Sequence, residues 1–130
     1  MPRDTVGEIS VRFDGDDTIE VESVRLSASV RGTGLCTSFL TESLRDALAK
    51  ASPITGRLSI FSEYAEEAFA CYVKAFNNVG YRLDRGVAPT DDPDYQRGSM
   101  WRQILIFKKK NMTDDERTRQ RQRLFDFFGL

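Results

Sequence analysis

Arg31-Gly32-Thr33-Gly34-Leu35-Cys36 lies between a strand-like run and a helix-like run. The strand-like run covers residues 18–27, and the helix-like run extends from Gly34 to Ala51. At such a junction the first N–H groups of the helix lack intrahelical partners, and the helix dipole is positive. Two glycines let a ligand approach the backbone closely, and Arg31 adds a cation. The segment therefore predicts a phosphate-binding turn, to which an ordinary glycine-containing turn is the alternative.

Alternating apolar and polar residues precede this junction. Residues 8–13 alternate as a half-buried strand does, and Asp14-Gly15 favours a tight turn into a second strand. The second strand extends from about Thr18 to Val30. Its apolar residues change phase near Glu22 and Ser23, which predicts a bulge or bend there, or burial on both faces of the strand.

Helices and strands alternate through the rest of the chain. Helical periodicity covers residues 34–51 and 64–77, and strand patterns cover residues 57–61, 81–83 and 100–107, with a polar loop at 84–99. A separate C-terminal helix is predicted within residues 113–130, where Thr113 and Glu116 fit a capping box. We therefore expect a layered α/β (α+β) fold, with a single domain at residues 1–112 and an amphipathic helical tail at 113–130.

The composition is that of a soluble globular protein. Of 130 residues, 40% are apolar and 30% are charged, and the net charge is −1. This balance argues against nucleic acid or an anionic membrane as partner. No apolar run approaches the roughly 20 residues that span a bilayer, and the N-terminus has no signal-peptide pattern, so we expect a cytoplasmic protein.

Cysteine and histidine content restricts the chemistry. The sequence has no histidine, which excludes Ser-His-Asp and Cys-His catalysis and argues against a zinc enzyme, so no metal is expected. Its two cysteines, Cys36 and Cys71, fall in predicted helices and form no CxxC pair. We expect two buried, reduced thiols, with a disulfide as the less favoured alternative.

Two motifs follow one another along the chain. The first reads Arg31-x-x-Gly34-x-Cys36 between a strand and a helix, and the second places Ala68, Tyr72 and Lys74 on a later predicted helix, with Gly80-Tyr81 after it. Over roughly residues 18–107, these motifs resemble those of the GNAT superfamily of acyl-CoA N-acyltransferases. That family has a strand, then Arg/Gln-x-x-Gly-x-Gly/Ala, then a helix, and Cys36 stands here at the usual Gly/Ala position. A later helix of the family carries Ala-x-x-x-Tyr-x-Lys followed by Gly-Phe or Gly-Tyr. Only one strand, residues 8–13, precedes the strand that leads into the first motif. The chain therefore resembles a minimal, N-terminally shortened member, similar in layout to short phage-encoded acetyltransferases.

This resemblance implies a GNAT-like mixed central sheet, with acetyl-CoA as co-substrate. In such a protein the pantetheine arm would pair with the strand at Leu26, Ser27 and Ala28. The pyrophosphate would lie on the turn and helix start formed by Arg31, Gly32, Thr33, Gly34, Leu35 and Cys36. The implied reaction is direct transfer of an acetyl group to a primary amine, which belongs to a protein lysine, an N-terminus, a polyamine or a small molecule.

Two catalytic roles follow from the same resemblance. Tyr72 corresponds to a general acid that protonates the departing thiolate, and a packed core tyrosine is the alternative. Without histidine, carboxylates are the available candidates for the general base. Glu22, near the expected bend, is the best placed; Glu20 and Glu63 are weaker candidates, and a solvated strand glutamate is the alternative for each.

The polar loop and the tail suggest partners. Asp91, Asp92 and Asp94 favour a cationic acceptor, although a solvated loop explains them as well. The tail, rich in arginine and aromatic residues, is expected to dock on the core or on a second subunit, which would give a homodimer. The competing hypothesis is a non-catalytic GNAT-like protein-binding module that acts through this acidic loop and aromatic tail.

Overall fold

A computed structural model describes residues 7–15, 17–26 and 34–128 of the chain. No helix in these ranges is both long and apolar enough to cross a membrane. The order of strands and helices agrees with the sequence prediction, and a short 3₁₀ turn lies within the predicted loop. The elements are β1 (Gly7–Asp14), β2 (Thr18–Leu26), α1 (Leu35–Leu48), β3 (Thr55–Ser62), α2 (Ala65–Asn78), β4 (Tyr81–Arg85), η2 (Pro89–Asp91), β5 (Trp101–Lys109) and α3 (Asp114–Phe128).

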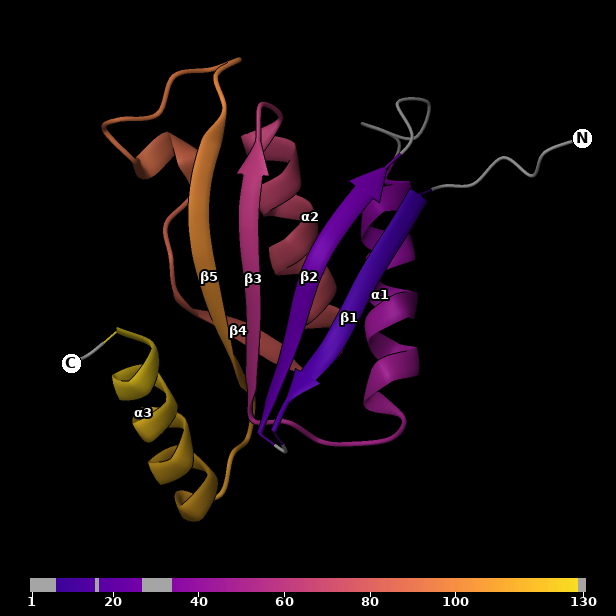
Figure 1. Cartoon of the computed structure of the whole chain (residues 1–130), viewed down its shortest axis with the longest axis vertical. Coiled ribbons are helices and arrows are strands. Elements are labelled where there is room, and N and C mark those ends of the chain that lie inside the picture. The colour runs from indigo at the N-terminus through magenta and orange to yellow at the C-terminus, as the bar shows by residue number, and fades with distance from the viewer. Residues whose placement is uncertain (1–6, 16, 27–33, 129–130) are drawn as a thin grey trace, which may run out of the picture.

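The described strands form one mixed sheet in the order β1-β2-β3-β5-β4. β2 and β3 are parallel, and the other neighbouring pairs are antiparallel. α1 follows β2 and forms the crossover to β3, as a parallel pair requires. α1 and α2 lie side by side behind the sheet in Figure 1, and α3 lies apart from them near the lower end of β5. The expected α/β (α+β) fold class is confirmed.

The two parallel strands stay paired over only half of their length. Residues 18–21 of β2 pair with residues 55–58 of β3, and we call this part the lower half of the sheet. Residues 22–26 and 59–62 continue both strands without pairing to each other, and we call this part the upper half. Figure 1 shows the two strands diverging toward their carboxyl ends. The divergence opens a gap between neighbouring strands of one sheet.

A bulge in β2 explains the change of phase in its sequence. Ser10 of β1 pairs with Ser23, whereas the next residue, Val11, pairs with Val21, so Glu22 is the extra residue. An extra residue shifts the side-chain alternation by one position. Val24 therefore packs against the same core as Val21, although the two are three positions apart. The predicted bulge near Glu22 and Ser23 is confirmed.

The core under the lower half is built around aromatic rings. Phe76 of α2 stacks on Phe107 of β5 with ring centroids 4.0 Å apart, and it meets the edge of Tyr81 at 6.1 Å. A Cβ on Gly56 would lie 2.5 Å from the ring of Phe76, so β3 needs glycine there. Tyr81 donates a hydrogen bond to the carbonyl oxygen of Pro53, and burial raises the pKa of Tyr81 to about 12.

A disulfide joins Cys36 in the first turn of α1 to Cys71 in the middle of α2. The expectation of two separate reduced thiols was wrong. Both cysteines lie on facing sides of the two helices, with their Cα atoms 6.1 Å apart, which is within the usual range for a disulfide. Spacing in the sequence could not show this contact, because it depends on how α1 and α2 pack.

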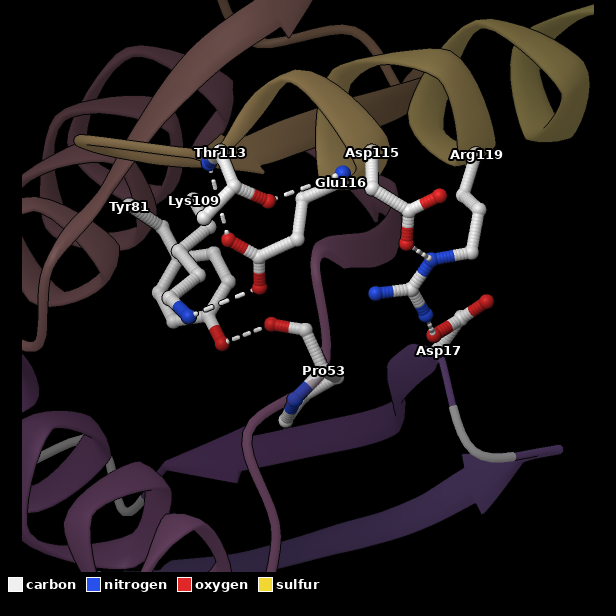
Figure 2. Close-up of polar contacts among 8 residues, drawn as sticks. All are labelled: Asp17, Pro53, Tyr81, Lys109, Thr113, Asp115, Glu116 and Arg119. Atoms are coloured by element: carbon white, nitrogen blue, oxygen red, sulfur yellow. Dashed lines mark hydrogen bonds and ion pairs between the residues drawn. The ribbon is translucent and has the colours of Figure 1, made fainter.

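α3 is held to the lower half of the sheet by polar contacts (Figure 2). The predicted capping box is confirmed: Thr113 N–H donates to Glu116 at 3.0 Å, and Glu116 N–H donates to the Thr113 hydroxyl at 3.1 Å. Glu116 also binds Lys109 of β5 at 3.0 Å. Further along the helix, Arg119 pairs with Asp17 in the β1–β2 turn. The tail therefore contacts both the C-terminal end of β5 and the turn of the N-terminal β1–β2 hairpin.

Candidate active site

The upper gap between β2 and β3 contains a cavity of about 340 Å³. Its walls come from β2, the end of β3, the first turn of α1 and the N-terminal half of α2. The lining residues are Val24, Leu26, Cys36, Ser62, Tyr64, Glu67, Ala68 and Tyr72. We call this space the β2–β3 cavity. It brings together Leu26, Cys36 and Tyr72, three of the residues proposed from the sequence.

The β2 side of the cavity offers both apolar side chains and backbone groups. β2 pairs with β1 along one edge over residues 18–26. Its other edge pairs with β3 only up to Val21, so the backbone from Glu22 to Leu26 has no strand partner on the cavity side among the described residues. An extended ligand with amide groups could pair there as an added strand. Ser27 and Ala28, expected to continue this contact, lie outside the described residues.

The N-terminus of α1 has the properties of an anion-binding site. Gly34 is the N-cap, with a left-handed φ of 83°, and no side chain caps the helix. The first turn, residues 35–38, contains no acidic residue, whereas α2 has two there and α3 has three. A Cβ on Gly34 would meet no atom of the described residues within 4 Å. The N–H groups and helix dipole there would favour a phosphate.

The structure describes only part of the predicted phosphate-binding segment. Gly34, Leu35 and Cys36 occupy the helix start, and Leu35 is 45% exposed. Arg31, Gly32 and Thr33 lie outside the described residues, so their predicted contacts with a phosphate stay predictions. Cys36 contributes one wall of the β2–β3 cavity through the same side chain that forms the disulfide.

Tyr72 is the cavity residue best suited to hold a proton. Its side chain is buried, and burial raises the pKa of its hydroxyl group. A raised pKa keeps the phenol protonated at neutral pH, as a general acid must be. It belongs to the core cluster and also lines the cavity, so packing and a role in chemistry are compatible.

The candidate bases lie outside the cavity lining. Glu22, at the bulge, is half-exposed, and its Oε2 lies 3.1 Å from Arg12 Nε. Glu20 is more enclosed, with its two carboxylate oxygens held by Arg12 at 2.7 Å and Arg57 at 2.5 Å. Glu63 is exposed. Glu67 is the carboxylate that lines the cavity, and its sequence pattern did not mark it as a candidate base.

The acidic loop, which contains Asp91, Asp92 and Asp94, packs partly against the rest of the protein. Trp101 Nε1–H donates to Asp92 at 2.8 Å, and this bond, followed by one from the N–H of Asp94, lowers the pKa of Asp92. The hydroxyl of Tyr95 donates to Glu66 at 2.8 Å. Asp91 and Asp94 remain exposed. The carboxylate of Asp92 therefore organises the loop, which leaves two of the three aspartates facing solvent.

Tyr64 and Ala68 line the cavity through the packing of α2 and were not proposed as site residues from the sequence. The same holds for Val24 of β2 and Ser62 of β3. Tyr64 precedes the helix, and Ala68 lies one turn after it and one turn before Tyr72. The i, i+4 spacing of these residues can be recognised in the sequence, but the cavity that they line cannot be predicted from it. No group of three or more metal-ligating side chains occurs in the described ranges.

Solved acetyltransferases share this architecture. A Bacillus subtilis acetyltransferase in complex with CoA superposes with a TM-score of 0.57 and 13% identity, over 86% of this chain and 74% of the other. An IAA acetyltransferase from Bacillus cereus superposes with a TM-score of 0.52 and 11% identity, over 78% of this chain and 67% of the other. A GNAT family acetyltransferase from Elizabethkingia anophelis with acetyl-CoA bound superposes with a TM-score of 0.52 and 10% identity, over 80% of this chain and 67% of the other.

No protein-family model matches the chain, and no curated protein sequence matches it. The likeness to the three solved structures is at low identity and concerns the fold. The fold expected from the two motifs is therefore confirmed: this chain has the GNAT fold.

Proposed function

We propose that this protein is an N-acetyltransferase that moves an acetyl group from acetyl-CoA directly to a primary amine. The observation that carries the proposal is the β2–β3 cavity, which connects an uncapped helix N-terminus to a buried tyrosine along an unpaired strand edge. Two of the similar solved structures are described as holding CoA or acetyl-CoA, which supports this choice of ligand.

The described residues fit the parts of an acyl-CoA. The start of α1 suits the pyrophosphate, because its N-cap Gly34 has no side chain and the helix dipole is positive at this end. The free edge of upper β2 suits the amides of the pantetheine arm. Val24, Leu26 and Ala68 would enclose the arm, and Tyr72 would lie beside its end. Bound acetyl-CoA would supply the activated thioester.

The residues of the chain would then orient the reactants and move protons. Holding both substrates in one cavity replaces a bimolecular encounter with an intramolecular step. Tyr72 would give its proton to the sulfur as the thiolate leaves. A carboxylate would take the proton of the amine, directly or through water; Glu22 stays the proposed base, and Glu67 is an additional candidate because it lines the cavity.

A thermal-shift titration with acetyl-CoA followed by a thiol-release assay tests the proposal. Acetyl-CoA at a hundred times its dissociation constant should stabilise the fold by about 2.7 kcal/mol. The amine panel should contain a lysine peptide, a peptide with a free N-terminus, a polyamine and a small amine. Release of free thiol that depends on one of these amines would support transfer, and no shift at millimolar acetyl-CoA would contradict the proposal.

A non-catalytic protein-binding module is the second candidate. Apolar side chains away from the cavity favour it: Phe61 on the sheet is 60% exposed, and Phe125 on α3 is 54% exposed. Such a module would use these surfaces and the exposed aspartates of the loop. It predicts neither a thermal shift nor thiol release in the same assays, so one set of measurements separates the two candidates.

A further inference from the structure

The Cys36–Cys71 disulfide forms part of the wall of the β2–β3 cavity. Cys36 lines the cavity, and Cys71 directly precedes Tyr72, which also lines it. Cys36 lies two residues after the N-cap Gly34. The bond therefore connects the two groups that the proposed function needs in a fixed relation: the phosphate-binding turn of α1 and the proposed proton donor of α2.

The start of α1 has few other buried anchors. The buried residues of this helix are Leu40, Thr41 and Leu44, all beyond its first turn. The hydrogen bond from Asn78 to Thr41 joins the two helices, but it lies at the C-terminal end of α2. Gly34 provides no side-chain cap. A covalent bond at Cys36 thus holds a helix end that packing holds less firmly than the middle of the helix.

We propose that the Cys36–Cys71 disulfide is a redox-controlled positioning bond for the acyl-coenzyme site. The inference rests on the proposed function, because it names the control of that same site. In the oxidised protein the bond holds the first turn of α1 against α2 and keeps the phosphate-binding N–H groups preorganised. In the reduced protein that turn moves independently, so only a fraction of molecules is ready to bind acetyl-CoA.

Reduction of the Cys36–Cys71 disulfide requires two electrons, which a dithiol reductant supplies. A thiolate of the reductant attacks Cys36 Sγ, because Cys36 is partly exposed in the cavity whereas Cys71 is only 6% exposed. The S–S bond breaks, and Cys71 leaves as a thiolate that takes a proton. The second thiol of the reductant then resolves the mixed disulfide and releases Cys36. Two electrons and two protons pass to the cysteines, and the reductant becomes a disulfide.

Because the reductant reaches Cys36 through the cavity, we expect bound acetyl-CoA to affect the reduction of the disulfide in turn. A coenzyme molecule in the cavity would cover the sulfur that the reductant attacks, so acetyl-CoA should slow reduction. Thermodynamic linkage requires that, if oxidation favours coenzyme binding, coenzyme binding also favours the oxidised form. A disulfide with only a structural role, remote from the ligand, would show neither effect.

Calorimetry with acetyl-CoA on the oxidised and the reduced protein tests the proposal. Dithiothreitol is used for reduction and then removed without air, and circular dichroism verifies that the reduced protein is folded at the temperature of the titration. If reduction leaves about a tenth of the molecules competent, the dissociation constant rises about tenfold. Equal affinities in the two forms would overturn this inference alone. No binding in either form would overturn the proposed function, and this inference with it.

Two matched variants distinguish the effect of the disulfide bond from the effect of either cysteine side chain. Cys36→Ala and Cys71→Ala remove the same bond from opposite ends, so both should bind acetyl-CoA as the reduced protein does and should not respond to dithiothreitol. Cys36→Ala also places a small residue at the helix start. If it binds acetyl-CoA as tightly as the oxidised protein, the bond has no positioning role.

A second measurement needs no variant and no stable reduced state. The rate at which dithiothreitol reduces the wild-type disulfide is followed by alkylation and mass spectrometry, with and without saturating acetyl-CoA. We expect at least a severalfold slower reduction with acetyl-CoA. An unchanged rate, under conditions where calorimetry shows binding, would contradict the proposal.

Discussion

The lower and upper halves of the sheet use the same two strands in different ways. In the lower half, residues 18–21 and 55–58 pair, aromatic rings pack behind them, and α3 adds polar contacts. In the upper half the strands separate around a cavity, and α1 and α2 are joined there by a disulfide. In the lower half the two strands pair with each other, whereas in the upper half β2 has no strand partner on the cavity side among the described residues.

Helix α2 contributes to both halves of the molecule with residues that are one turn apart. Phe76 is fully buried against Phe107 in the lower half, and Tyr72, four residues earlier, lines the cavity. Substitutions in the lower half should therefore change stability, and substitutions in the upper half should change binding or turnover.

Gly34→Glu should abolish binding of acetyl-CoA while the protein stays folded. The carboxylate would place a negative charge and a side chain where the phosphate is proposed to bind, and the left-handed φ of 83° would add a strain of about 1–2 kcal/mol. Calorimetry measures the binding. Gly98→Glu is the matched control, because Gly98 has φ 86° and equally open surroundings in the loop before β5. Undiminished affinity in Gly34→Glu would refute the proposed phosphate site.

Phe76→Ala should lower the free energy of unfolding by about 3–5 kcal/mol. The substitution removes the ring that stacks on Phe107 and fills the space beside Gly56. Urea unfolding followed by circular dichroism gives the value. Phe61→Ala is the control, since Phe61 is largely exposed and loses only its surface contact with Arg102, so stability should change by less than about 1 kcal/mol. Similar losses in both variants would argue against the lower half as the main source of stability.

Tyr72→Phe should reduce turnover about a hundredfold, with little change in affinity for acetyl-CoA or in stability. The ring still fills the same space, but the proton on the leaving sulfur can no longer come from this residue. Steady-state kinetics with the best amine of the panel separates kcat from KM. Tyr95→Phe is the control, because Tyr95 bonds Glu66 and does not line the cavity. Wild-type turnover in Tyr72→Phe would remove Tyr72 from the mechanism.

Glu116→Gln should give a small loss of stability that depends on pH. The backbone N–H of Thr113 and then the ammonium group of Lys109 lower the pKa of Glu116 below its ordinary value of 4.5. A lowered pKa in the folded state stabilises the protein above 4.5, and this contribution disappears as the pH falls through the folded-state pKa. Urea unfolding at several pH values should show the difference between wild type and variant shrinking toward acid. A difference between wild type and variant that stays constant as the pH falls would contradict this account.

Local signals in the sequence predicted most of the fold. Hydrophobic periodicity located the strands and helices, the phase change located the bulge at Glu22, and Thr113 with Glu116 located the start of α3. Each of these signals acts over a few residues, so it can be read without knowing the packing. The two motifs then selected the GNAT fold, although neither establishes the activity.

The cavity and the disulfide could not be predicted in the same way. Both depend on where α1 and α2 meet, and Cys36 and Cys71 are 35 residues apart in the sequence. Absence of a CxxC pattern favoured free thiols, but a disulfide needs only proximity in space. Glu67 was missed because its position on α2 marks it as an ordinary first-turn acid. It is a candidate only because the diverging strands open beside it.

The ion pair between Arg119 and Asp17 joins residues that are 102 positions apart. Contacts of such long range require closure of a long loop, which costs entropy before any contact repays it. The β1–β2 hairpin and its turn can form early from local interactions, whereas this pair must wait until β5 has added to the sheet. We therefore expect Arg119→Ala to accelerate unfolding and to leave the folding rate almost unchanged, which stopped-flow kinetics in urea would measure.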